Sequence, residues 1–133
     1  MTVSLSFDIV PQGKGRPRSS HAGGVFRTHT PAKTVAYERT LRDQAALQIR
    51  GHEPLSGPLY VSMAFYFPQK TKKRHQTPKA TKPDIDNLVK AVADALNGIV
   101  WHDDNQIARI LAGKEWAAEG RIDVIVQQIG RKP

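Results

Sequence analysis

Hydrophobic and polar positions alternate in two stretches of the chain, with the period of two that β-strands show. From Val3 to Ile9 every second side chain is apolar and those between are small or polar, which predicts a half-buried strand over residues 2–10. Residues 58–68, PLYVSMAFYFP, carry apolar side chains at both sets of alternating positions. Because such a strand has two apolar faces, we expect it at the centre of a sheet.

Two other stretches repeat apolar residues with the period of an amphipathic helix. Residues 31–50 form the first predicted helix, with Thr30 as its N-cap and Pro31 at its first position. Residues 84–97 form the second, and Gly98 suits its end because glycine readily adopts the left-handed backbone conformation.

Segments rich in basic residues separate these elements. Residues 11–31 combine Gly, Pro and basic side chains, which indicates a loop with a short strand around 25–27. Residues 69–82 contain six Lys or Arg and no acid, and a loop of this length is typically functional or disordered. Two further strands, 106–117 and 121–129, follow the second helix, and the short turn between them predicts an antiparallel hairpin.

The order of predicted elements is strand, basic loop, helix, strand, basic loop, helix, strand, strand. Such interspersed elements with a terminal hairpin favour an α+β fold, in which a single mixed β-sheet is covered by two main helices. The chain has 133 residues and no sequence typical of an interdomain linker, so residues 1–133 are expected to form one domain.

The charge balance adds a partner to this picture. Twenty Lys and Arg against twelve Asp and Glu give a net charge of +8, which favours a polyanionic partner, most commonly nucleic acid. The absence of cysteine excludes disulfides, thiolate nucleophiles and Cys-based zinc sites. No apolar stretch approaches the roughly 20 residues of a membrane span, and no secretory signal opens the chain. We therefore expect a cytoplasmic protein that is not bound to a membrane.

Against this basic background, five of the twelve acidic residues lie within residues 81–107. Asp84 and Asp86 stand at the predicted start of the second helix, where a single acid is well explained by N-capping or by the helix dipole. Together they allow another interpretation, because two carboxylates on a turning chain can converge on one point. Asn87 adds a neutral oxygen ligand or an orienting hydrogen bond.

One turn beyond Asp86, Lys90 lies on the same face of the predicted helix. Its ammonium either forms an i,i+4 ion pair or stands beside a scissile phosphate and offsets developing negative charge. Asp94, another turn on, is expected to pair with Lys90 or to face solvent.

A second acidic pair, Asp103 and Asp104, precedes the next strand in WHDDNQI. Because side chains alternate in direction along a strand, only one of the two should face the start of the second helix, and the geometry does not choose between them. His102 is interpreted as a solvated loop residue or, alternatively, as a proton shuttle.

Carboxylates without cysteine or a histidine cluster make a hard, all-oxygen site, which favours Mg²⁺ or Mn²⁺. A calcium EF-hand is excluded because Leu88 occupies a ligand position and the required glycine is missing. Carboxylates repel phosphate unless a divalent ion lies between them. In so basic a chain, the pattern therefore indicates a metal-dependent nuclease.

The segment KPDIDNLVKAVADALNGIVWHDDNQI, with GKGRPR upstream, resembles the RusA family of Holliday junction resolvases. The resemblance covers about residues 11–116 and rests on D-x-D-N-L-x-K, a DALNG-like helix end and the DD-Q turn. It implies a homodimeric endonuclease, often of prophage origin, that cuts four-way DNA junctions symmetrically with Mg²⁺ or Mn²⁺. By motif position it assigns metal binding to Asp84, Asp86 and Asp104, and a catalytic role to these residues and Lys90.

Basic residues of both loops are expected to contact the phosphates of the junction arms. They are Lys14, Arg16, Arg18, Lys70, Lys72, Lys73, Arg74, Lys79 and Lys82. Some relatives carry a basic residue where this chain has Pro83, so a phosphate contact at that position is not carried over. Two other functions fit the same residues: a non-catalytic nucleic-acid-binding module, and a nuclease for other branched DNA.

Overall fold

A computed structural model gives the structure of the chain and describes residues 1–15, 18–22, 25–29 and 31–130, with side chains described outside 16–30. The elements, in chain order, are β1 (Thr2–Phe7), β2 (Arg18–Ala22), β3 (Val25–His29), α1 (Ala32–Gln48), β4 (Leu59–Pro68), the 3₁₀ helix η1 (Lys72–Arg74), α2 (Ile85–Ala95), the 3₁₀ helix η2 (Asp104–Gln106), β5 (Ile107–Ala117) and β6 (Arg121–Gln128).

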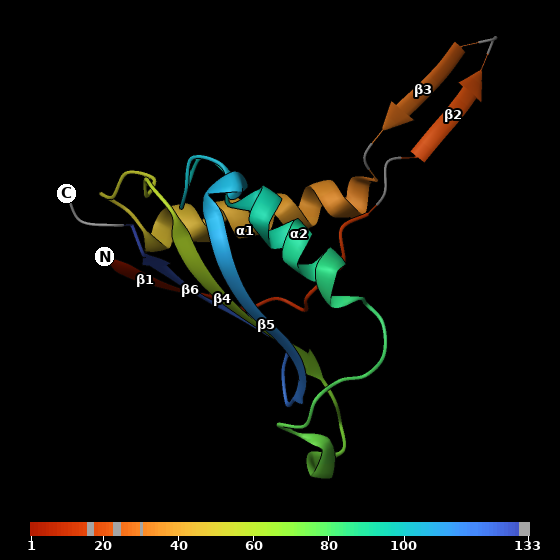
Figure 1. Cartoon of the computed structure of the whole chain (residues 1–133). Helices are drawn as coiled ribbons and strands as arrows, with labels where there is room; N and C mark the ends of the chain where they lie inside the picture. Colours follow the sequence, from red (N-terminus) through yellow and green to blue (C-terminus); the bar gives the residue numbers. More distant parts are fainter. Residues whose placement is uncertain (16–17, 23–24, 30, 131–133) are drawn as a thin grey trace.

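Four strands form one mixed sheet in the order β1-β6-β4-β5, and both helices pack on the same face of it (Figure 1). β4 pairs in parallel with β5 and antiparallel with β6, so it is central, as its two apolar faces predict. A single mixed sheet with two helices confirms the predicted α+β class. In the described part of the chain, no helix is long and apolar enough to cross a bilayer.

The predicted hairpin of the last two strands is wrong. β5 and β6 are antiparallel, but β4 lies between them, so Ala118–Gly120 cross the end of β4. Two interstrand spacings amount to about 10 Å, which three linking residues can span. Gly120 is required at this crossing because a Cβ there would lie 2.7 Å from a methyl carbon of Val10. Central pairing of the most apolar strand outweighs the local turn signal.

The first basic loop also differs from the prediction, because it contains two strands and not one. β2 and β3 pair antiparallel, with Ala22 opposite Val25, and they project from the body of the molecule (Figure 1). A Gly-Gly pair between two short strands is a known hairpin signal in a sequence. The basic composition of the segment obscures this signal here.

Both helices begin within one residue of their predicted starts. α1 begins at Ala32 with Pro31 at the N-cap position, and Thr30, the predicted cap, lies outside the described residues. α2 begins after its N-cap Asp84, and Gly98 has a φ of +80°, in the left-handed region that favours glycine.

The core lies between the sheet and the two helices. Leu88, Ala91 and Val92 of α2 are fully buried, together with Phe65 of β4 and Trp101 in the connection to η2. Because α2 buries this apolar stripe, its opposite side, which carries most of the candidate polar residues, faces away from the core.

Replacing Phe65 by Ala should lower the free energy of unfolding by about 3–5 kcal/mol, because the side chain is fully buried and would leave a cavity. Leu47→Ala, at a side chain 62% exposed on α1, is the matched control and should change it by less than about 0.5 kcal/mol. Urea denaturation followed by circular dichroism measures both. Equal losses in the two variants would contradict this placement of the core.

Candidate active site

The solvent-facing side of α2 carries a polar stripe that includes Asp86, Lys90 and Asp94 at four-residue intervals. The Lys90 Nζ lies 3.5 Å from Oδ2 of Asp94, so the predicted pairing of these two residues is present. The Lys90 side chain is nevertheless 62% exposed. Its ammonium is thus oriented by Asp94 and remains accessible to a phosphate.

Asp84 occupies the N-cap position of α2 but does not act as a side-chain cap. Its backbone is extended, with φ −67° and ψ 142°, and its carboxylate accepts no capping hydrogen bond. The exposed side chain instead lines an open hollow of about 430 Å³ together with Lys82, Pro83 and Asn87. The explanation of Asp84 by N-capping is therefore not supported, and its carboxylate is free to bind another group.

Asp86 is also exposed, in the first turn of α2. Its carboxylate has no ion pair or side-chain hydrogen bond with any residue that the structure describes. The acids at the start of α2 are therefore both available to a ligand, although a negative charge there also interacts favourably with the helix dipole.

Asp103 and Asp104 have different environments. Asp103 caps η2, because its Oδ1 accepts the N–H of Asn105 at 2.9 Å while Oε1 of Gln106 accepts the N–H of Asp103 at 2.9 Å. This hydrogen bond from Asn105, followed by one from Asp104, lowers the pKa of Asp103. Asp103 thus has a structural role that its neighbour lacks.

Asp104 is half-buried. Burial raises the pKa of its carboxyl, the neighbouring carboxylates of Asp103 and Asp94 raise it further, and a hydrogen bond with Asn97 opposes them. Asp104 therefore lies beside the second half of α2, whereas the prediction placed one member of the pair at its start. Asp86 and Asp94 are separated by about 12 Å along the helix axis.

The structure therefore places Asp84 and Asp86 at the start of α2, and Asp104 near Asp94 in its second half. Among the described residues, no three Asp, Glu, His or Cys side chains are grouped closely enough to hold one metal ion. Coordination of one or two divalent ions by Asp84, Asp86 and Asp104 stays a prediction. His102 is exposed, with its backbone N–H bonded to Gln106.

Lys14 has a different environment from the one predicted. Its ammonium contacts the carboxylate of Glu38 on α1 and lies 3.4 Å from Oδ2 of Asp94, and its backbone N–H donates to the carbonyl of Asn87 at 3.0 Å. Burial alone would lower the pKa of Lys14, but Glu38 and Asp94 raise it. Lys14 thus links α1 to α2, and its assignment as a DNA contact stays a prediction.

The glycines beside Lys14 are a signal in the sequence for the placement of this lysine. A Cβ on Gly15 would lie 2.2 Å from Oγ1 of Thr34, and one on Gly13 would lie 3.4 Å from side-chain carbons of Asn87 and Pro83. The backbone of GKG therefore passes close to both helices. The lysine between these glycines is therefore held close to both helices and is only partly exposed.

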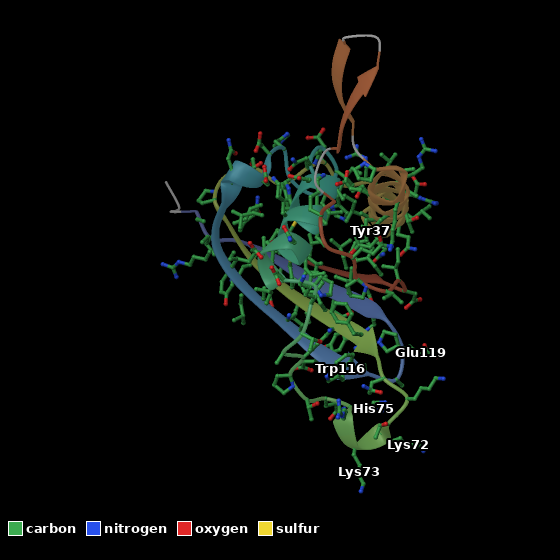
Figure 2. The ribbon with its side chains drawn as sticks, turned by 90° about the vertical axis from the view of Figure 1, so that its right-hand side faces the viewer. Tyr37, Lys72, Lys73, His75, Trp116 and Glu119 are labelled. Carbon is green, nitrogen blue, oxygen red and sulfur yellow. The ribbon has the colours of Figure 1, made fainter. Side chains whose placement is uncertain are left out.

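In the second basic loop, most of the basic side chains are exposed and Lys79 is buried. Lys70, Lys72, Lys73, Arg74 and Lys82 are exposed, and η1 lies at the end of the molecule furthest from the β2–β3 hairpin (Figures 1 and 2). Lys79 is only 8% exposed and its ammonium contacts aromatic rings, so its assignment as a DNA contact is corrected. Arg16 lies outside the described residues, as does the side chain of Arg18.

Comparison with known proteins identifies the family. The model of the endodeoxyribonuclease RusA family matches residues 8–127, most of the chain. The chain belongs to the RusA endodeoxyribonuclease family. It is 31% identical to the uncharacterized protein YqaN of Bacillus subtilis (strain 168), over 90% of this chain and 91% of that protein. It is 33% identical to the crossover junction endodeoxyribonuclease rusA of Lactococcus phage r1t, over 54% of this chain and 56% of the phage protein.

The opposite pKa shifts of the acidic pair predict opposite effects of neutralising each acid. The pKa of Asp104 is raised in the folded state, so the protonated form of this carboxyl stabilises the fold at acidic pH. This stabilisation is lost as the pH rises from about 4 through the raised pKa. Asp104→Asn should therefore gain in melting temperature relative to wild type, by up to a few degrees, as pH rises toward 7. Asp103→Asn should instead fall in melting temperature relative to wild type as the pH rises. The pKa of Asp103 is lowered, so the fold is stabilised by the ionised carboxylate that this variant lacks.

Thermal unfolding of the three proteins between about pH 3.5 and pH 7 measures these differences. Differences of the same sign for both variants would contradict the environments described for the two carboxyl groups.

Proposed function

We propose that this protein is a Mg²⁺-dependent endodeoxyribonuclease that resolves four-way DNA junctions by paired, symmetric nicks during recombination and repair. Family membership supports the nuclease activity. The structural observation that carries the proposal is the N-cap Asp84, whose carboxylate makes no capping bond although it stands where a cap is expected.

The residues that would hold the divalent ion are Asp84 and Asp86, joined by Asp104 through its position in the family motif. Their donor chemistry fits, because hard cations prefer carboxylate oxygens and the first two carboxylates have no partner among the described residues. A divalent cation supplies Lewis-acid chemistry to phosphodiester hydrolysis. We expect Mg²⁺ as the cofactor, with Mn²⁺ able to replace it.

In this proposal Lys90 binds a non-bridging oxygen of the scissile phosphate. Its ammonium is exposed and Asp94 fixes its direction, which is the arrangement that a group offsetting developing negative charge requires. Lys70, Lys72, Lys73, Arg74 and Lys82 contact the DNA backbone around the cut and supply affinity without reading sequence.

Asp86→Asn tests the enzyme against a non-catalytic binding module. The variant should bind a synthetic four-way junction as wild type does but cleave it at least about 100-fold more slowly, because a metal ligand is lost while the basic surface is kept. Asp8→Asn, with the same charge change at an exposed position after β1, is the control and should cleave normally.

Both proteins are assayed with and without Mg²⁺ on a mobile junction, a Y-fork and a linear duplex at one salt concentration, and all nicks are mapped. Wild-type protein that binds the junction but never cuts it would establish the binding module. Equal cutting of the Y-fork would establish a nuclease for other branched DNA.

A homodimer is the second part of the proposal. Resolution needs two opposed nicks in a substrate with approximate two-fold symmetry, and a C₂ dimer presents two equivalent sites to it. Light scattering should give twice the chain mass of 14.8 kDa, and cleavage of a plasmid cruciform should give linear product. A monomer that only nicks the plasmid would contradict the paired mechanism.

A further inference from the structure

Residues 76–83, which we call the strap, connect η1 to the start of α2. The strap lies against the outer edge of β5 and pairs with it: Gln76 donates its N–H to the carbonyl of Trp116 at 2.7 Å, and Trp116 donates to the carbonyl of Thr77 at 3.0 Å. The N–H of Lys79 donates to the carbonyl of Lys114 at 2.9 Å. The strap ends directly before Asp84, the first proposed metal ligand.

Lys79 anchors the strap from within. Its ammonium lies 4.5 Å from the centre of the Trp116 ring and 5.1 Å from that of Phe67, and only 8% of the residue is exposed. It donates to the carbonyl and hydroxyl of Thr81 and to the carbonyl of Lys82. An ammonium has three N–H donors, so every donor of Lys79 has an acceptor, and two of the three acceptors are strap carbonyls.

Lys114 anchors the strap from β5. Its ammonium donates to the carbonyl of Thr81 at 2.7 Å and to the carbonyl of Pro83 at 2.9 Å. The carbonyl of Thr81 therefore accepts from both lysines, and the carbonyls of residues 81, 82 and 83 are all bound by one or the other. Figure 2 places Trp116 between the main body and η1, at the level where the strap is held.

We propose that Lys79 and Lys114 are positioning residues for Asp84: by binding the three carbonyls before it, they fix where its carboxylate points. The inference rests on the function proposed above. Asp84 has no capping bond that would orient it, so its direction depends on the backbone that the strap supplies. A ligand displaced by about 1 Å is costly for catalysis, so a rigid backbone here has a direct effect on rate.

A buried ammonium is a weak means of stabilising a fold, because the loss of its hydration offsets what its contacts gain. It is an effective means of fixing carbonyl groups in one arrangement, because it is bonded in three directions at once. Removing the ammonium of a positioning residue should therefore change the position of Asp84 more than the stability of the fold.

The test uses the full-length Lys79→Met and Lys114→Met variants, in which an apolar chain of similar length keeps the packing and removes the donors. Lys33→Met, an exposed lysine of α1 outside the proposed site, is the charge-matched control. Three quantities are measured: the Kd for Mn²⁺ by electron paramagnetic resonance, hydrogen exchange of the strap amides, and kcat and KM for junction cleavage.

Each lysine variant should bind Mn²⁺ about 10-fold more weakly, as expected when support of a metal ligand is removed, and kcat should fall while KM stays within about twofold. Strap amides should exchange faster, and Lys79→Arg should recover part of the Mn²⁺ affinity. Both lysines bind the carbonyl of Thr81. The fold loss of Mn²⁺ affinity in the double variant should therefore be smaller than the product of the fold losses in the two single variants.

Asp86→Asn is measured beside them so that the two proposals can fail separately. If Asp86→Asn abolishes Mn²⁺ binding while both lysine variants bind it as wild type does, the positioning role is refuted and the proposed function stands. If Asp86→Asn leaves Mn²⁺ binding unchanged, the proposed function itself fails. Should Lys79→Met not fold, Lys114→Met alone decides, because it leaves the buried ammonium in place.

Discussion

The candidate site depends on the burial of one side of α2. Its apolar stripe is enclosed between the sheet and α1, and this fixes the rotation of the helix. Asp86, Lys90 and Asp94 must then face solvent, because their spacing places them on the opposite side. The same burial presents α2 to Lys14, whose ammonium joins Asp94 to Glu38. The side of α2 on which Asp86, Lys90 and Asp94 lie thus follows from hydrophobic packing that involves none of these three residues.

The acidic side chains on and beside α2 lie close to two lysines. The protein is strongly basic, yet its acidic side chains beside α2 are accompanied by Lys14 and Lys90, so the local charge is partly compensated. Asp104 is the exception: its pKa is raised because it is partly buried beside other carboxylates.

Local patterns in the sequence predicted most helices and strands correctly, but they predicted the pairing of strands and the tertiary contacts of side chains less well. The two apolar faces of β4 correctly predicted a central strand. The helical period of α2 correctly predicted that Leu88 and Val92 are buried, whereas Ile85, which has the same period, is 37% exposed. The pairing of β5 with β6 was wrong because a short turn carries no information about a third strand between them. Lys79 was assigned to DNA from the basic composition of its loop, but its burial depends on Phe67 and Trp116, which lie elsewhere in the sequence. The ion pair of Lys14 with Glu38 likewise depends on a residue outside any local pattern. The capping role of Asp103 depends on Gln106, only three residues later in the chain. This capping-box spacing is visible in the sequence and could have distinguished the structural role of Asp103 from that of Asp104.

The central claim is that the carboxylates at the start of α2 bind a divalent cation. Anomalous diffraction from crystals of the protein grown with Mn²⁺ locates such an ion directly. We predict a peak about 2.1–2.3 Å from carboxylate oxygens of Asp84 and Asp86. A peak found only between Asp94 and Asp104, with none at the first turn of α2, would contradict the account.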